Sequence, residues 1–426
     1  MIRTALLTAL VSLSVVGGAA RAETQLFAPE NLSAWLDVRA VSANGEASWR
    51  APNRDYDGVG GGFCKLRYGH ETKLDLAQAA INWKPRLADT VTAYVLAQYT
   101  PGSLTDFGVS EAFIKWKPVP TSDLRWSVRL GQMFPPVSME HDGAGWSVSR
   151  TITPSAINSW IGEEVLVDGI ELNIHKTIAG QDFAFTGALF TGNDTAGTIL
   201  SWRGWALHDV ASDRDSRLPL PGGDEQGWYK LFDIYQAPFT EPTAETDGHV
   251  GHYLRFDWHP PAPIAVNLEY YANNGDPASI RHAQWGWDTT FWNLGVQAKP
   301  AAATEILAQV MTGHTCMGWP LGDGTWAIDT NYDSAYLLVS QSLKGSARLT
   351  GRIDAFAVKD RSMRTVDDNS DRGYAATLAY IRPVSAHLDL AVEAMTVQSN
   401  HPARVTHTLA AHQSQSQLQI ALKLHI

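Results

Sequence analysis

The stretch that decides the fold lies at the end of the chain and reads Gln417-Leu418-Gln419-Ile420-Ala421-Leu422-Lys423-Leu424-His425-Ile426. Every second residue from Leu418 to Ile426 is apolar, and the residues between them are mostly polar. Successive side chains of a strand point to opposite faces of its sheet. The alternation therefore predicts a strand with one apolar face and one polar face, and its period of two does not fit a helix.

The same alternation recurs along the chain. In 124–130 the polar positions are Arg125, Ser127 and Arg129, and in 347–357 they include Arg348, Arg352 and Asp354. Collecting all such segments gives sixteen expected strands: 32–42, 74–83, 90–99, 109–117, 124–132, 164–175, 182–191, 249–258, 264–272, 288–298, 304–313, 333–343, 346–358, 373–382, 387–397 and 414–426. Most are long enough for a tilted strand to cross a bilayer, which takes about 9–11 residues.

The connections between these segments alternate in length. Odd-numbered connections have nine or more residues, whereas even-numbered ones have six or fewer. Three short turns share an aromatic residue, a polar residue and a proline: Trp83-Lys84-Pro85, Trp116-Lys117-Pro118 and Trp258-His259-Pro260. Short turns on one rim and long loops on the other are typical of outer-membrane barrels, in which the short turns are periplasmic. Aromatic rings suit the membrane boundary.

Composition and charge exclude several classes. The chain has 426 residues, of which 44% are hydrophobic and 18% charged. Residues 1–22 combine a basic start, an apolar run and Ala20-Arg21-Ala22, which predicts a cleaved signal peptide. The remaining 404 residues carry 31 basic and 44 acidic side chains, a net charge of −13. Such an exported, acidic chain is a poor candidate for binding nucleic acid, and no later apolar run is long enough for a membrane helix.

The expected fold class is all-β, a transmembrane antiparallel barrel of about sixteen strands that comprises residues 23–426. Closure removes the free sheet edges, which a bilayer does not tolerate. Sixteen strands enclose a lumen too wide for side chains to fill. The sequence therefore predicts a water-filled passage across the outer membrane of a Gram-negative bacterium, through which small hydrophilic solutes or ions diffuse.

The architecture resembles that of the sixteen-stranded bacterial outer-membrane porins. The stretch Arg129-Leu130-Gly131-Gln132-Met133-Phe134-Pro135-Pro136-Val137-Ser138-Met139-Glu140 is similar to a segment of the phosphate-selective-type porins, where a strand enters the third loop. The resemblance implies a homotrimer in outer-membrane lipid, an inward-folded third loop and no cofactor. It does not identify the solute, because no dense Lys/Arg ladder occurs in one loop.

The third long loop, 133–163, is the candidate constriction. Arg125 and Arg129 are expected to face the lumen from the fifth strand, opposite Arg348 and Arg352 on the thirteenth. The loop could bring Glu140 and Asp142 between the two pairs, which would create a transverse field across the pore. The alternatives are an external loop, and arginines that pair with carboxylates such as Asp354 and Glu111 and only stiffen the wall.

Other features leave alternatives open. The loop 192–248 holds Trp202, Trp205, Trp228 and Tyr229, which could cap the pore, contact a neighbouring subunit or stack on sugars. Cys64 and Cys316 are expected in the first and sixth long loops and either form a disulfide or stay unpaired. No G-x-S-x-G or H-E-x-x-H motif occurs, so we expect neither catalysis nor a metal. The rival hypotheses are a secreted carbohydrate-binding β protein and an outer-membrane enzyme barrel.

Overall fold

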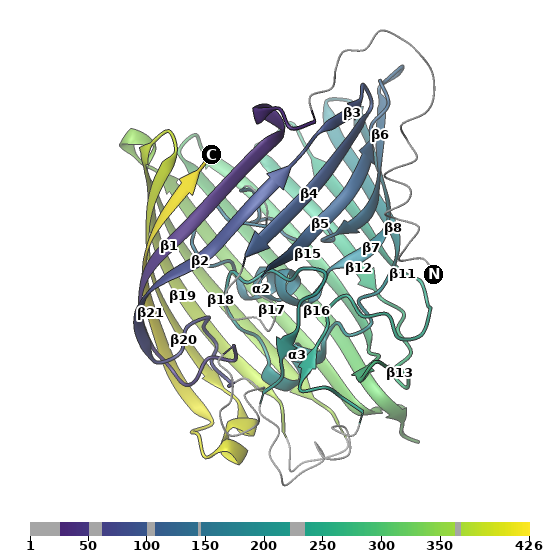
Figure 1. The fold of residues 1–426 in the computed structure, drawn as a ribbon, viewed down its shortest axis with the longest axis vertical. Helices are drawn as coiled ribbons and strands as arrows, with labels where there is room; N and C mark the ends of the chain where they lie inside the picture. Colours follow the sequence, from purple (N-terminus) through teal and green to yellow (C-terminus); the bar gives the residue numbers. More distant parts are fainter. Residues whose placement is uncertain (1–25, 51–61, 100–106, 144–145, 222–234, 363–367) are drawn as a thin grey trace.

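The computed structural model describes residues 26–50, 62–99, 107–143, 146–221, 235–362 and 368–426. The predicted signal peptide lies outside this part of the chain. Seventeen strands form one antiparallel sheet (Figure 1): β1 (Leu32–Asn44), β2 (Glu71–Trp83), β3 (Arg86–Ala88), β4 (Val91–Tyr99), β5 (Phe107–Trp116), β6 (Leu124–Met133), β7 (Val167–Ile178), β8 (Gln181–Thr191), β11 (Gly251–His259), β12 (Ile264–Ala272), β15 (Asp288–Ala301), β16 (Thr304–Pro320), β17 (Trp326–Ser342), β18 (Arg348–Asp360), β19 (Asp371–Ser385), β20 (Leu388–Asn400) and β21 (His412–His425).

The sheet closes into a barrel because β1 pairs with β21, with Trp35 opposite His425 and Asn44 opposite Ser416. The strands β2 and β3 both pair with β4, so they occupy one position in the wall. All other neighbours follow the order of the chain. The described strands therefore occupy sixteen positions, and the predicted sixteen-stranded antiparallel barrel is confirmed.

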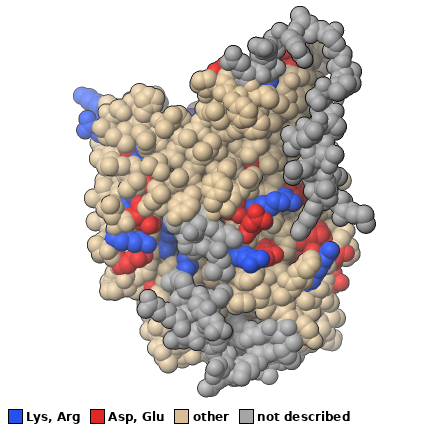
Figure 2. All heavy atoms as spheres, viewed as in Figure 1, with Lys and Arg blue, Asp and Glu red and all other residues tan. Residues whose placement is uncertain are grey.

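The two faces of the wall differ as the alternation predicts. On β21 the side chains of Leu418, Ile420, Leu422 and Leu424 are exposed on the outside, while Gln415, Gln417 and Gln419 are buried inside. In the face shown in Figure 2, the wall near the short turns is largely uncharged, and charged side chains gather nearer the long loops. An apolar outer surface and a polar interior are the arrangement that a bilayer requires of a barrel.

One connection departs from the expected lengths. The sixth long loop was expected between the predicted strands 304–313 and 333–343, but β16 and β17 continue past these ends, which leaves only residues 321–325 between them. Cross-strand pairing continues through Met317 opposite Ile328 and, after an irregularity, ends at Pro320 opposite Trp326. Cys316 therefore lies in a strand and not in a loop. Thr, Asn and His in this stretch mask its alternation, because the two strands extend beyond the apolar belt.

Short elements lie before β1 and in the connections between the strands of the wall. They are the α-helices α2 (Ala156–Glu164) and α3 (Thr198–Arg203), the 3-10 helices η1 (Pro29–Asn31), η2 (Lys344–Ser346) and η3 (Pro402–His407), and the small strand pairs β9 (Leu218–Pro219) with β10 (Phe239–Thr240) and β13 (Ile280–Arg281) with β14 (Gln284–Trp285). Among the described residues, no helix is long and apolar enough to span a membrane. Figure 1 shows α2 and α3 within the outline of the barrel.

Candidate functional site in the barrel lumen

The third loop connects β6 to β7, and its described residues, 134–143 and 146–166, lie inside the barrel. Its helix α2 begins where the Ser155 hydroxyl accepts a hydrogen bond from the Asn158 N–H, and all nine helical residues are buried. The Ile152 N–H donates to Glu393 on β20 at 2.7 Å, and the Asn158 amide donates to Gln309 on β16 at 2.9 Å. These two wall residues point into the lumen, so the loop is anchored to the inner face of the barrel.

Arg352 on β18 holds this loop in place. Its guanidinium donates to Asp354 at 2.8 Å, to the Thr153 carbonyl at 2.7 Å and to the Pro154 carbonyl at 2.9 Å. It also lies 3.3 Å from Glu140 of the loop. The side chain of Arg352 is fully buried, so these contacts leave no face of it for a passing solute. This arrangement is the wall-stiffening alternative for Arg352, with Asp354 as one partner.

The arginines of the opposite wall have other partners. Arg129 on β6 makes a two-pronged ion pair with Glu171 on β7, at 2.7 and 2.5 Å, and not with Glu111, the carboxylate that the wall-stiffening alternative names. Arg125 lies 2.8 Å from the Nδ1 atom of His175. Glu140 reaches only the Arg352 side, so the loop does not place its carboxylates midway between the two arginine pairs.

Asp142 and Arg348 belong to one cluster of charged side chains, near the short-turn ends of β16 and β18. The loop residue Arg150 donates to Asp142 and to Glu305 on β16, both at 2.6 Å. Arg348 donates to the same Glu305 at 3.4 Å. The predicted residues Asp142 and Arg348 are therefore joined by Glu305 and Arg150, two residues that the sequence patterns did not single out together.

A second loop, between β8 and β11, packs on α2. Arg203 of α3 donates two hydrogen bonds to Glu163, at 2.8 and 2.6 Å, and His208 lies 3.1 Å from the same carboxylate. Burial opposes the charge on Glu163, but these two partners outweigh it and hold its pKa below the usual range. Glu164 has no such partner, and burial raises its pKa to about 7.

The first loop is joined to the same assembly by Asp209. This carboxylate accepts from Arg39 on β1 at 2.5 Å and from Arg67 of the first loop at 2.8 Å. Burial alone would raise the pKa of Asp209, yet the two guanidinium groups lower it well below its usual range. Segments of three long loops thus pack against one another inside the barrel.

The tryptophans of the long loop serve this packing. Trp202 and Trp205 are buried, and the Trp205 ring lies edge-on to Trp160 of α2 at 5.9 Å between centroids. Neither ring is available for stacking on a sugar at the surface. Trp228 and Tyr229 lie outside the described residues.

The two thiols are free, which excludes the disulfide. Cys64 lies against Gln415 of β21, at 3.4 Å, and burial raises its pKa to about 12. Cys316 sits between β15 and β17, where it pairs with Asp288 and Asp329 across the strands. Cys316 is fixed in the wall on β16, whereas Cys64 belongs to the first loop and lies against β21, so the two thiols are in different parts of the barrel.

A cavity of about 440 Å³ remains on the other side of the lumen, between the loop at Pro136 and the inner faces of β4 to β11. Its charged lining consists of Lys84, Lys115, Arg129, Arg255, Glu171 and Asp257. Arg255 donates to Asp257 at 2.6 Å and to the Pro136 carbonyl. Within the described part of the chain, neither Lys84 nor Lys115 has an ion-pair partner, so the lining has a surplus of positive charge. Lys115 and Arg255 occupy inward-facing positions of the expected strands 109–117 and 249–258, so the alternation of the sequence could have identified both as lumen residues.

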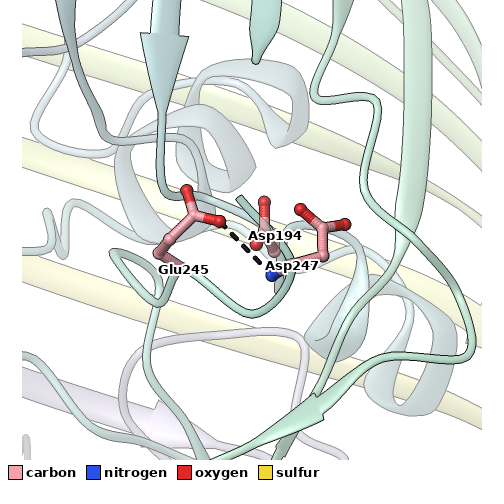
Figure 3. Close-up of side chains that lie close together, drawn as sticks. All are labelled: Asp194, Glu245 and Asp247. Atoms are coloured by element: carbon pink, nitrogen blue, oxygen red, sulfur yellow. Dashed lines mark hydrogen bonds between the residues drawn. The ribbon is translucent and has the colours of Figure 1, made fainter. Parts of the chain in front are cut away.

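Three carboxylates gather at the long-loop rim, where Asp194, Glu245 and Asp247 lie with oxygens within 4.8 Å of one another (Figure 3). Each accepts backbone N–H bonds: Asp194 from Thr246, Glu245 from Gly192, and Asp247 from residues that include His249. Burial, followed by the two neighbouring carboxylates, raises the pKa of Asp194 to about 7. These hydrogen bonds indicate that the three carboxylates stabilise the conformation of the loop, and we assign no metal to them.

Comparison with known proteins gives likeness in structure only. No protein-family model and no curated protein matches the chain. The outer-membrane channel DcaP of Acinetobacter baumannii is similar in fold, with a TM-score of 0.55 and 10% identity over 93% of this chain and 96% of that one. An anion-selective porin from Comamonas acidovorans matches with a TM-score of 0.46 and 11% identity, over 93% of this chain and 98% of that one.

OmpF of Salmonella typhi, in a structure with daunomycin, matches with a TM-score of 0.47 and 8% identity, over 93% of this chain and 97% of that one. At these identities the comparisons speak to the fold alone, and DcaP is the one of the three whose TM-score supports that argument. The closed wall, its apolar outer face and this likeness lead to one conclusion. The protein is a porin-like, sixteen-stranded β-barrel of the outer membrane of a Gram-negative bacterium.

Proposed function

We propose that the protein is a channel for the passive diffusion of small hydrophilic solutes or ions across the outer membrane. The observation that carries the proposal is the cavity of about 440 Å³ that the inward loop leaves beside the β4 to β11 wall. Barrels of this width enclose water, and a hydrated, charged passage favours polar solutes over apolar ones. We propose no catalytic step and no cofactor for this passage.

The lining favours anions over cations. Arg129 and Arg255 are balanced by Glu171 and Asp257, whereas Lys84 and Lys115 add charge that no described side chain neutralises. A cleft lined mainly by one sign of charge concentrates the opposite ion, because its low-dielectric walls focus the field. The local surplus is positive although the whole chain carries a net charge of −11.

The constriction belongs to the third loop. Pro136 is its point of contact with the cavity, and the contacts of Arg352 and Glu393 keep the loop against the opposite wall. In this proposal Arg352 acts as an anchor, and Arg129 lines the path. The transverse field expected between opposed arginine pairs is replaced by a one-sided positive wall.

Reversal potentials across a planar bilayer test the preference. Lys115→Glu should shift the selectivity of the channel toward cations, with a larger shift at low salt because salt screens the side chain. Lys344→Glu, on an exposed turn outside the cavity, is the matched control and should leave the potential unchanged. Equal potentials for Lys115→Glu and the unchanged protein at low salt would show that the path avoids this wall.

We also propose that the barrel assembles as a homotrimer in outer-membrane lipid, as its resemblance to the porins implies. Native mass spectrometry of the detergent-solubilised protein should give the mass of three chains. A single-chain mass under conditions that preserve other membrane assemblies would contradict this part of the proposal and would leave the diffusion channel standing.

A further inference from the structure

A groove of about 620 Å³ lies in the outer face of the wall, across β16 to β21. Cross-strand pairing places Val310, Ala335, Ala355 and Tyr374 in one row. Val310 and Tyr374 are more than half exposed and form the two sides, whereas the short Ala335 and Ala355 side chains between them form the floor. The groove therefore opens to the surroundings of the barrel and not to its lumen.

Register also fixes the height of the groove. Toward the short turns, the exposed Leu337 and Ile353 continue the apolar outer surface below it. Toward the long loops, the next row contains Asp333, Arg372 and His412. Because the long loops are extracellular, this change from apolar to polar side chains marks the outer boundary of the membrane. The groove lies just inside that boundary, in the outer leaflet.

The polar end of the groove has two basic side chains that make no ion pair within the described residues. Arg372 on β19 lines the groove and is paired with Ala357 on β18. Lys359 lies two residues beyond Ala357 on β18, toward the long-loop rim, and is therefore a diagonal neighbour of Arg372. Both side chains are exposed, and neither makes an ion pair within the part of the chain that the structure describes. Asp333 is the one carboxylate in the lining of the groove. An apolar trough that ends at unpaired cations is complementary to a molecule with an acyl chain and an anionic head.

We propose that this groove binds a phosphorylated glycolipid of the outer leaflet. One acyl chain lies over Ala335 and Ala355 between Val310 and Tyr374, and a phosphate of the head group contacts Arg372 and Lys359. The outer leaflet of a Gram-negative outer membrane consists of such lipids, so this ligand is present in the leaflet that contains the groove. The site is separate from the proposed channel, since its lining faces lipid.

The test uses the full-length protein in detergent, incubated with hexa-acylated lipid A that carries two phosphates, and analysed by native mass spectrometry. Ala355→Trp fills the floor of the groove from the lipid side, and Arg372→Ser removes the cation. Ala40→Trp is the matched control, because Ala40 is an exposed, outward-facing alanine on β1, far from the groove. Heat-modifiable gel mobility confirms that each variant is folded.

The bound fraction of lipid A should fall at least tenfold in Ala355→Trp and in Arg372→Ser and stay unchanged in Ala40→Trp. Dephosphorylated lipid A should bind the unchanged protein as weakly as lipid A binds Arg372→Ser, and free inorganic phosphate should not compete. Unaltered binding in both groove variants would overturn the proposal. A loss of oligomers in Ala355→Trp with lipid binding intact would assign the groove instead to contact with a second copy of the chain.

Discussion

Arg352 makes ion pairs with two carboxylates and donates hydrogen bonds to two loop carbonyls from a fully buried position. Arg352→Ala would leave Asp354 and Glu140 buried without a cation, and breaking such a pair costs about 3–5 kcal/mol. We expect the free energy of unfolding in lipid vesicles, measured with urea and tryptophan fluorescence, to fall by this amount. Arg382→Ala, at an exposed position near the short-turn end of β19, is the control. A loss below about 1 kcal/mol would mean that the loop holds its place without this anchor.

The raised pKa of Glu164 predicts that the packing of α3 on α2 weakens as the pH rises, which is opposite to the effect of a carboxylate in an ion pair. Its pKa is about 7 in the folded protein, above its ordinary 4.5, so the folded state holds the extra proton between these values. Packing of α3 on α2 is therefore strongest below about pH 4.5 and weakens as the pH rises through 7, by up to about 3 kcal/mol. Protection factors of the Ile199 and Leu200 amides, which donate to Glu164, should fall between pH 5.5 and 8. Equal factors at both pH values, or the same fall in Glu164→Gln, would refute the assignment.

At the scale of the strand, β21 separates the lipid face from the lumen face. Leu422 faces lipid with half of its side chain exposed, and an arginine near the bilayer midplane costs about 2–4 kcal/mol. We expect that loss for Leu422→Arg, measured by unfolding in vesicles. Ser414→Arg, on the same face but near the long-loop rim, should cost less than about 1 kcal/mol. Equal, small losses for both variants would argue against membrane burial of this strand.

Alternation identified the wall, because each strand must present one face to lipid and one to water. Where that constraint ends, sequence reasoning failed: Cys316 lies beyond the apolar belt, in a part of β16 whose alternation is weak. The helix α2 was missed for a related reason. All nine of its residues are buried among polar wall side chains and other loops, so it shows no single apolar stripe.

The arrangement of the lumen depends on contacts between distant segments. The inward direction of Arg129 and Arg352 followed from period two alone, but their partners did not. Glu171 meets Arg129 through the register of β6 and β7, and Glu140 meets Arg352 across 212 positions of the sequence. Local patterns carry no information on such pairs. They also could not reveal that loop anchors fill one side of the lumen and leave the cavity at Lys115 on the other.

At the scale of the whole molecule, the central claim is that solutes pass beside the β4 to β11 wall. Lys115→Cys tests it through the conductance of single channels in a planar bilayer. The native Cys64 and Cys316 are buried, and the raised pKa of Cys64 keeps its thiol protonated, so a charged methanethiosulfonate reagent modifies the introduced cysteine first. Lys344→Cys, exposed on a turn away from the cavity, is the control.

Modification of Lys115→Cys by the anionic, bulky reagent should lower the single-channel conductance in steps and reduce the preference for anions, while Lys344→Cys keeps its conductance. The account would be contradicted by a fully modified Lys115→Cys protein, verified by mass, whose conductance and reversal potential are the same as before modification.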